Sequence, residues 1–486
     1  MSSKTSSPLA SAVLATVAVA AVLRFVGLGS SLWYDEIVTL VDSARLPFVD
    51  IVTTFPGVNT HPFYSVLAHA SFGLFGESAW ALRLPACLFG VGCVWMAYVL
   101  GTMAITQLEA WAGAVVLATS YHHIWFSQNA RGYTMMGFFA LVSTWSLLRA
   151  VSGGRRGDYL AYALACAAGI YTHLTMAFVV AGHVAVMLGG YAAGWPPVRE
   201  RLRDGVMPLW WTWVGGGLLS LLVYAPFIPG LLAHLGYEAP VEAAQVATGS
   251  WALAEAIRSV LAGAGVPAAL AGGAVACLGV LRLWRRAPLM LALLVMPAVV
   301  TAVVVIGLQQ PLRPRFFFFL SGAAAIFVGC GLGLLADLLT GRWRVTLPSA
   351  ASAATVALAL LLAAGSVVAL PKNYRVPKQD FDGAVRFLET AESAGARIAS
   401  AGPACWPLER YYGKKGTWPC LATMDDLRTV TSTAPRTLVV ITLTDYIVDA
   451  PLREYLRGTC PVARVFPGTL GGGDMVVCDA PKTEGL

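Results

Sequence analysis

Long apolar runs without charged residues place the strongest constraint on how this chain can fold. Hydrophobic residues make up 57% of its 486 residues, and charged residues only 12%. A soluble domain cannot bury that much apolar surface, whereas a lipid bilayer accommodates it as helices of about 17–25 residues. The sequence therefore predicts a polytopic α-helical membrane protein with a smaller, more polar C-terminal part.

About eleven stretches have the length and composition of membrane spans. They lie near residues 8–28, 81–102, 105–126, 133–151, 158–172, 175–193, 209–231, 257–281, 288–308, 316–338 and 346–370. The first stretch is longer than the apolar core of a typical cleaved signal peptide, so we expect it to remain as a span.

The distribution of arginine predicts the orientation of these spans. Short loops rich in Lys and Arg usually face the cytoplasm. From the fourth span onward, every second loop carries them: Arg155 and Arg156; Arg199, Arg201 and Arg203; Arg282, Arg285 and Arg286; Arg342 and Arg344. We therefore expect a protein of the cell membrane (inner or plasma) with its N-terminus inside and its C-terminus outside. These arginines supply most of the net charge of +7, which does not indicate nucleic-acid binding.

The chain divides by composition into a transmembrane domain, 1–370, with an outward loop at 29–80, and an extracytoplasmic α/β domain, 371–486. In the latter, 380–394 has a helical pattern, and 437–443 and 475–478 read as strands. Four of the nine cysteines lie there: Cys405, Cys420, Cys460 and Cys478. In an oxidising compartment we expect two disulfides, and proximity favours Cys405–Cys420 and Cys460–Cys478.

Two adjacent acids, Asp35 and Glu36, follow closely on the first apolar span. Trp33 and Tyr34 precede them and are typical of residues that anchor a segment at a membrane interface. Carboxyl groups near low-dielectric surroundings can have a raised pKa, which suits a general base. The alternative is a solvated loop whose acids have no specific role.

Basic residues also gather in the predicted outward loops, where the orientation rule disfavours them. The arginines are Arg83, Arg131, Arg313 and Arg315, and the histidines of the same surface are His61, His122, His123 and His173. Several outward cations together indicate an anionic partner, most simply phosphate. For any single Arg the alternative is snorkelling to lipid head groups, and for any single His it is packing. The histidine spacing does not predict a metal site.

An Asp-x-Asp sequence, Asp380-Phe381-Asp382, resembles the metal-holding motif of nucleotide-sugar enzymes. Asp at the start of a helix also caps free backbone N–H groups and interacts favourably with the helix dipole. We interpret Asp380 as a helix cap.

The outward segments together resemble the GT-C superfamily of integral-membrane glycosyltransferases. They are most similar to the bacterial relatives of protein O-mannosyltransferases and of the aminoarabinose transferases that modify lipid A. The resemblance is carried by Leu32–Glu36, His61–Tyr64, Ala81–Pro85, His123–Arg131 with Tyr133, and Tyr171–His173. Lys378–Phe381 resembles the start of the outer domain of that family.

The resemblance implies roles for individual residues. Asp35 would be the catalytic base and Glu36 its neighbour in the acidic motif, while His61 would lie near the donor phosphate. Arg131 matches the Arg of the family's Ser-Gln-x-Ala-Arg segment. The other candidate substrate-binding residues are Gln128, Tyr133, His173, Arg83, Arg313 and Arg315. Many relatives have Glu where this chain has Asn129, so no cofactor is assigned and metal dependence stays open.

Nucleotide sugars are absent outside the cytoplasm, so a sugar donor there must be attached to a membrane lipid. We expect transfer of a sugar, mannose or a similar hexose or pentose, from a polyprenyl-phosphate donor to a protein, glycan or lipid acceptor. A base would activate the acceptor hydroxyl and cations would stabilise the departing phosphate, with inversion in a single displacement. The alternative is a lipid-linked-sugar flippase or transporter, which would place ionisable groups inside the spans.

Overall fold

The computed structural model describes residues 8–57, 60–203, 205–235, 269–309, 312–342 and 348–482. The chain forms two compact units. The first contains Met1–Val26, Phe48–Leu74 and Arg83–Leu370, and the second contains Gly27–Pro47, Phe75–Leu82 and Pro371–Leu486. Two short segments of the N-terminal part therefore group with the C-terminal residues.

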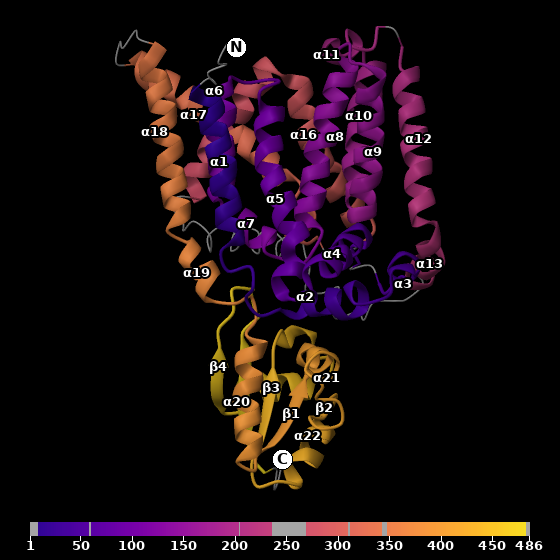
Figure 1. The fold of residues 1–486 in the computed structure, drawn as a ribbon, viewed down its shortest axis with the longest axis vertical. Helices are drawn as coiled ribbons and strands as arrows, with labels where there is room; N and C mark the ends of the chain where they lie inside the picture. The colour runs from indigo at the N-terminus through magenta and orange to yellow at the C-terminus, as the bar shows by residue number, and fades with distance from the viewer. Residues whose placement is uncertain are drawn as a thin grey trace. The chain divides into compact units, whose positions relative to one another are not determined.

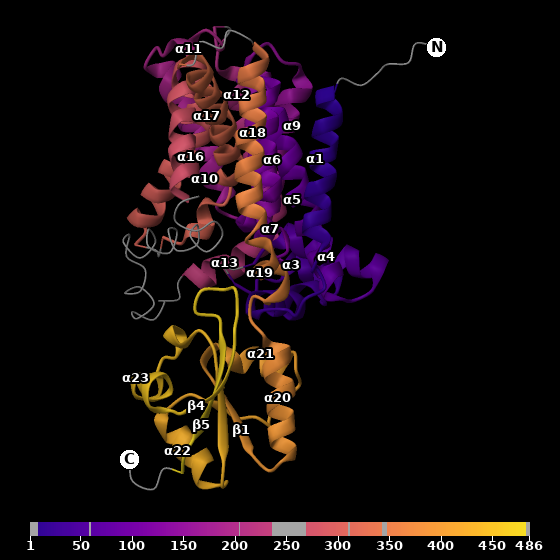
Figure 2. The same ribbon diagram turned by 90° about the vertical axis from the view of Figure 1, so that its left-hand side faces the viewer.

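The first unit is a bundle of long helices that run side by side (Figures 1 and 2). They are α1 (Pro8–Phe25), α5 (Ala79–Gly101), α6 (Gln107–Thr119), α8 (Tyr133–Val151), α9 (Arg156–Thr172), α10 (Met176–Ala192), α12 (Met207–Tyr224), α16 (Pro288–Gly307), α17 (Leu320–Arg342) and α18 (Pro348–Val367). Shorter helices include α3 (Phe48–Thr53), α4 (Pro62–Phe75), α7 (Tyr121–Ser127) and α13 (Ile228–Leu235).

A helix lies in every predicted span. In the one near 257–281 the described residues are helical from 269 onward, and the rest of that span falls outside the described residues. Among the described helices, six are long and apolar enough to cross a membrane. They are Ala79–Gly101, Tyr133–Val151, Met207–Ala233, Pro288–Gly307, Leu320–Gly341 and Ala350–Arg375. Leu9–Phe25 and Met176–Ala192 are shorter apolar helices. The protein is therefore a multi-pass membrane protein, and the count of eleven spans and their orientation stay predictions.

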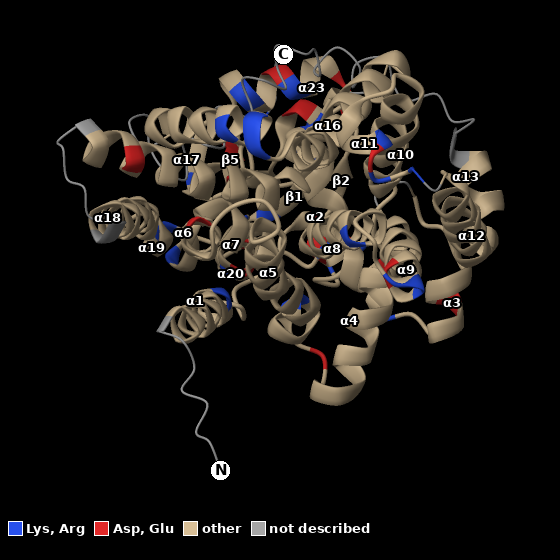
Figure 3. Ribbon diagram, turned by 90° about the horizontal axis from the view of Figure 1, so that it is seen from above, with Lys and Arg blue, Asp and Glu red and all other residues tan. Residues whose placement is uncertain are grey.

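Charged residues are sparse along the bundle helices, whose ribbons are mostly tan in Figure 3. One buried exception is paired: Arg282 contacts Glu109 of α6 at 2.8 Å and Asp337 of α17 at 3.1 Å. Glu109 also accepts a hydrogen bond from the backbone N–H of Thr106, which caps α6. Low charge leaves lipid-facing surfaces apolar, as a bilayer requires.

Small residues let α6 and α17 approach closely. A Cβ added to Gly113 of α6 would collide with the backbone of Ala325, and one added to Gly329 of α17 would collide with the carbonyl of Glu109. Close backbone approach through glycine is the usual packing solution in membrane helices, where burial from water contributes little. This crossing helps to fix α6 and, through it, the short helix α7 that follows.

The second unit contains a five-stranded sheet in the order β2-β1-β3-β5-β4. The strands are β1 (Arg397–Ala401), β2 (Cys420–Leu421), β3 (Thr437–Ile441), β4 (Val462–Phe466) and β5 (Met475–Ala480). β1 pairs in parallel with β2 and β3, whereas β5 is antiparallel to β3 and β4. Helix α20 (Phe381–Ser393) covers one face, and α22 (Met424–Ser432) and α23 (Ala450–Glu454) cover the other (Figure 2).

The helix cap and the disulfides that the sequence predicts for the C-terminal domain are both present. The carboxylate of Asp380 accepts a hydrogen bond from the backbone N–H of Gly383 at 2.9 Å, so its interpretation as the cap of α20 is confirmed. Disulfides join Cys405 to Cys420 and Cys460 to Cys478. The first ties helix α21 (Cys405–Arg410) to strand β2.

Candidate active site

The acidic pair lies in the first turn of a six-residue helix, α2 (Tyr34–Thr39), in the second unit. Glu36 is buried and Asp35 is only 8% exposed. The carboxylate of Glu36 accepts a hydrogen bond from the backbone N–H of Trp33 at 3.4 Å, which satisfies a donor at the helix start. Negative charge in the first turn also interacts favourably with the helix dipole.

Tyr34 fixes the start of α2 through contacts within the second unit. Its backbone N–H donates to the side-chain carbonyl of Gln379 at 2.9 Å, and its ring lies 6.3 Å from the ring of Trp406. Burial raises the pKa of Tyr34, and the charges of Asp35 and Asp42 raise it further. The Tyr34 hydroxyl is therefore neutral at physiological pH.

An ion pair joins the two N-terminal segments of the second unit. Arg45 contacts Glu77 at 2.6 Å, and its guanidinium also lies over the ring of Tyr411, 5.5 Å from the centroid. The hydrogen bond to Glu77 raises the pKa of Arg45. Both partners of the ion pair are partly exposed, so the pair contributes little to stability by itself. Its geometry nevertheless links 27–47 and 75–82 to the C-terminal domain.

The basic candidates gather in the first unit around two histidines. The ring centroid of His61, just before α4, lies 4.9 Å from that of His173 and 5.3 Å from that of Tyr133. His173 follows α9, and Tyr133 begins α8. Three sequence motifs that are distant in the chain therefore meet at the ends of their helices.

Hydrogen bonds indicate which ring nitrogen carries the proton in each histidine. Nδ1 of His61 lies 3.3 Å from the carbonyl oxygen of Thr172, which can only accept, so Nδ1 is protonated. Nδ1 of His173 accepts from the backbone N–H of Thr175 at 3.2 Å, so the proton of its neutral ring is on Nε2. Nε2 of His61 is buried and has no hydrogen-bond partner among the described residues.

Two arginines act electrostatically on this pair. Burial lowers the pKa of His61 well below its usual value, and Arg131, the neighbouring His173 ring and Arg315 lower it further. Burial, Arg131 and Arg315 lower the pKa of His173 to about 3. Both rings are neutral at pH 7 in a region of positive potential, which favours an anion.

Glycine allows the segment that carries Arg131 to approach His61. A Cβ added to Gly132 would lie 2.7 Å from the Thr172 side chain and 3.1 Å from Nδ1 of His61. The first distance is too short for any real side chain, so a larger residue would push the 128–133 segment away. Arg131 itself is 1% exposed.

The remaining candidates also belong to the first unit. The amide of Gln128 donates to the carbonyls of Arg24 and Val26 at the end of α1, at 3.0 and 2.5 Å. Arg83 is fully buried in α5, and Arg313 precedes the short 3₁₀ helix η3 (Pro314–Phe317). The hydrogen bonds of Gln128 indicate a role in holding the 128–133 segment.

Sequence reasoning missed Arg24, which is fully buried near the end of α1. Its guanidinium donates to the carbonyls of Ala20, Leu117 and Ala118, and to the hydroxyl of Ser127. It also lies 2.8 Å from Nδ1 of His123, which must accept. His123 thus helps to bind α7 to α1. The sequence signal that could have identified Arg24 is a single charged residue near the end of an otherwise apolar span.

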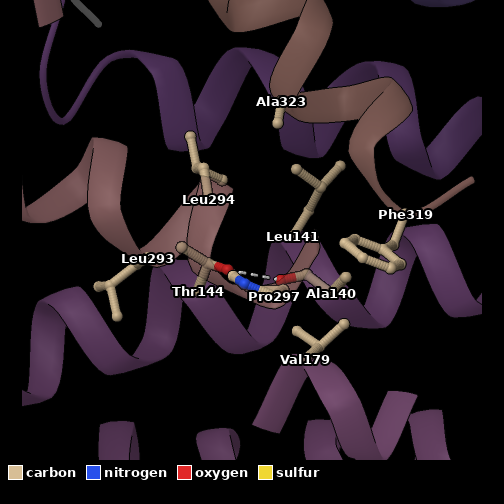
Figure 4. A pocket seen from close by; sticks show the side chains of 9 residues that line it. All are labelled: Ala140, Leu141, Thr144, Val179, Leu293, Leu294, Pro297, Phe319 and Ala323. Atoms are coloured by element: carbon tan, nitrogen blue, oxygen red, sulfur yellow. Dashed lines mark hydrogen bonds between the residues drawn. The ribbon is translucent and has the colours of Figure 1, made fainter. Parts of the chain in front are cut away.

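A small pocket lies within the helix bundle. Side chains from α8, α10, α16 and α17 line it, together with Phe319 (Figure 4). The hydroxyl of Thr144, its one polar side chain, donates to the carbonyl of Ala140 at 2.8 Å. The lining suits apolar contact, and it includes no residue of the acidic or basic groups. Within the described ranges, no group of three His, Cys, Asp or Glu could hold a metal ion.

Comparison with known proteins identifies related folds. Residues 59–229 match the family of dolichyl-phosphate-mannose-protein mannosyltransferases. A comparison with curated proteins found no match. ArnT from Cupriavidus metallidurans aligns over 97% of this chain and 98% of its own in the apo state, with 14% identity and a TM-score of 0.54. Its structure bound to undecaprenyl phosphate aligns equally well, with a TM-score of 0.54 and coverage of 96% and 97%.

The oligosaccharyltransferase AglB from Archaeoglobus fulgidus, in complex with an inhibitory peptide and a dolichol-phosphate, is similar over 98% of this chain and 75% of its own. The identity is 12% and the TM-score is 0.56. These proteins are GT-C glycosyltransferases. The chain therefore has the fold of the GT-C membrane glycosyltransferases, and residues 59–229 carry the sequence pattern of their dolichyl-phosphate-mannose-protein mannosyltransferase family.

Proposed function

We propose that this protein transfers a sugar from a polyprenyl-phosphate donor to an acceptor outside the cytoplasm. The observation that supports this most directly is the positive region around His61 and His173, created by Arg131 and Arg315. It suits the phosphate of a lipid donor, because charge-assisted hydrogen bonds from Arg are strong and match phosphate geometry. The similar folds of ArnT and AglB, seen with undecaprenyl phosphate and dolichol-phosphate, agree with such a ligand.

In this proposal Asp35 is the general base. It removes the proton from an acceptor hydroxyl while that oxygen attacks the anomeric carbon, and the bond to the donor phosphate breaks on the opposite face. Arg131, Arg315 and the protonated Nε2 of His173 stabilise the negative charge on the departing polyprenyl phosphate. One displacement inverts the anomeric centre. Mannose or a similar hexose or pentose is the expected sugar, and a protein, glycan or lipid the acceptor.

The alternative, a flippase or transporter, predicts ionisable groups along a path through the spans. His183 in α10 is one buried example, but it is held by Thr144 and Tyr162 at 3.2 and 3.4 Å. Such a network is also the usual way in which polar residues join membrane helices. An assay of chemistry separates the two proposals, because a transporter leaves the sugar–phosphate bond intact.

The test uses purified full-length protein in lipid nanodiscs with polyprenyl-phosphate sugars and candidate peptide, glycan and lipid acceptors. Mass spectrometry should detect a glycosylated acceptor together with free polyprenyl phosphate, and NMR should show an inverted anomeric configuration. Retention of configuration would exclude the single displacement. Movement of intact donor across vesicles without product, under every acceptor tried, would favour the transporter. Addition of EDTA and then Mg²⁺ or Mn²⁺ measures metal dependence.

A further inference from the structure

Gln379 is buried between two hydrogen bonds that join distant parts of the second unit. Its side-chain carbonyl accepts from the backbone N–H of Tyr34, and its amide nitrogen donates to the hydroxyl of Thr442, each at 2.9 Å. Gln379 is fully buried, and Thr442 is 1% exposed. The Tyr34 N–H can only donate, so it determines which end of the amide faces α2.

Helix α2 depends on such contacts for its position. It has six residues, and a helix of that length does not persist in water without outside support. The Tyr34 N–H belongs to the first turn, whose donors have no partner inside the helix. Gln379 satisfies this donor one residue before Asp35. The hydrogen bond therefore holds the end of α2 that carries the acidic pair.

The backbone beside Gln379 is held by the loop between β4 and β5. The backbone N–H of Thr469 donates to the carbonyl of Pro377 at 2.9 Å, and that of Leu470 to the carbonyl of Lys378 at 3.2 Å. A Cβ on Gly468 would collide with the Lys378 carbonyl, so glycine is required for this close approach. This close approach gives Gly468 a physical role in holding the backbone beside Gln379.

Thr442, the hydrogen-bond partner of the Gln379 amide nitrogen, is held at the end of the sheet. Thr442 directly follows β3, the central strand, and the next residue, Leu443, has a left-handed backbone with φ of 46°. The backbone N–H of Leu443 donates to the carbonyl of Gly472 at 3.2 Å. A second contact joins α2 to the C-terminal domain. The ring of Trp406 packs near that of Tyr34, and Trp406 directly follows the disulfide-bonded Cys405.

We propose that Gln379 is a positioning residue that couples the C-terminal α/β domain to the acidic helix α2. This inference rests on the proposed role of Asp35 as the base. A base must lie within hydrogen-bond reach of the proton that it removes, and a misplacement of about 1 Å can cost about 100-fold in rate. The C-terminal domain thus sets the position of a group that belongs by sequence to the first loop.

The test replaces Gln379 with Met, which has a similar shape but makes neither hydrogen bond. Gln107→Met is the matched control, because Gln107 is an exposed glutamine at the start of α6. Two quantities are measured on folded, purified full-length protein: steady-state sugar transfer, and hydrogen–deuterium exchange of the peptide that spans residues 31–39.

In Gln379→Met we expect kcat to fall about 10- to 100-fold with the KM for the lipid donor nearly unchanged. Exchange in 31–39 should become faster, whereas the control should match the wild type in both measurements. Thr442→Val should cause a smaller change of the same kind. The double variant should be no worse than Gln379→Met alone, because both changes break one connection.

Wild-type turnover and exchange in Gln379→Met would overturn the inference, and so would faster exchange without loss of kcat. If Gln379→Met does not fold, the same two measurements on Thr442→Val decide. Asp35→Asn in the same assay separates the two proposals. Full activity of Asp35→Asn would show that Asp35 is not the base. Gln379 would then have no catalytic group to position, even if its replacement makes exchange in 31–39 faster. If Asp35→Asn is inactive but Gln379→Met behaves as the wild type, Asp35 stays the proposed base and only the positioning role of Gln379 is excluded.

Discussion

His61 and His173 lie with their ring centroids 4.9 Å apart, although helices α4 to α9 separate them in the chain. Both rings have a lowered pKa because they are buried beside Arg131 and Arg315. The fold therefore keeps two neutral imidazoles in a region of positive potential that favours an anion. This relationship has consequences for both stability and ligand binding.

The first prediction concerns stability at low pH. The unfolded chain takes up protons at these histidines below a pH of about 6.5, whereas the folded chain does not. Stability from the neutral rings is thus complete above that pH and is lost as the pH falls toward the folded-state pKa, about 3 for His173. Between pH 6.5 and 5 the loss of folding free energy should be about 1.7 kcal/mol for each ring that stays neutral in the folded state. The thermal midpoint measured across this range should fall with acidification.

His173→Gln and His61→Gln supply the comparison for that experiment. Each variant removes one titrating group and should flatten the fall of the midpoint between pH 6.5 and 5. Undecaprenyl phosphate should also reduce the fall, because a bound anion favours the protonated rings. A pH dependence equal to that of the wild type in both variants would contradict the assignment to these histidines.

Loss of the proposed base should affect the chemical step. Asp35→Asn keeps the shape of the side chain but removes the basic carboxylate, so kcat should fall by at least about 100-fold. Glu36→Gln should be damaging but less complete. Transfer kinetics, normalised to folded protein, provide the measurement. Asp425→Asn, at an exposed surface ion pair, is the matched control and should behave as the wild type. Substantial activity in Asp35→Asn would rule out this residue as the base.

Arg131 and Arg315 should contribute to binding of the donor phosphate. Charge-assisted hydrogen bonds are worth about 1.5–3 kcal/mol, so Arg131→Ala and Arg315→Ala should each weaken donor use by about 10- to 100-fold. Lys should restore only part of the loss, because it lacks the planar fork of donors. The kcat/KM for the lipid donor is the measurement, and Arg386→Ala on the exposed face of α20 is the control. Normal donor kinetics in both alanine variants would place the phosphate elsewhere.

The two disulfides should form when the protein is made in its native compartment. Non-reducing peptide mapping should recover Cys405 with Cys420 and Cys460 with Cys478. Loss of the second bridge, in Cys460→Ser with Cys478→Ser, should lower the stability of the C-terminal domain by about 2–4 kcal/mol. Cys277→Ser removes a free cysteine and should not change it. Four free thiols in the native protein would contradict the oxidising location.

Orientation can be measured independently of activity. Reporters fused after Arg156 and at the C-terminus should lie in opposite compartments, with Arg156 in the cytoplasm, because arginine-rich loops alternate along the chain. The same compartment for both reporters would contradict the predicted topology and the extracytoplasmic position of the proposed active site.

The sequence by itself determined those features that depend only on residues close together along the chain. Helices coincide with the apolar runs, because a segment in lipid must satisfy its own backbone hydrogen bonds. Asp380 caps α20 because its carboxylate reaches an N–H three residues on. Motif order and the family resemblance also pointed to the GT-C fold. Short strands such as β1 and β4 were missed, because a few residues of weak alternation do not distinguish a strand from a loop.

Only the tertiary structure decided which distant residues meet. Nothing in the spacing of Tyr34 and Gln379 predicts that one accepts a hydrogen bond from the other, or that Gly27–Pro47 groups with the C-terminal domain. The same holds for His61 and His173, and for Arg24 among the carbonyls of α6. Side-chain periodicity reports which face of an element is buried, whereas the identity of the partner depends on how whole elements pack.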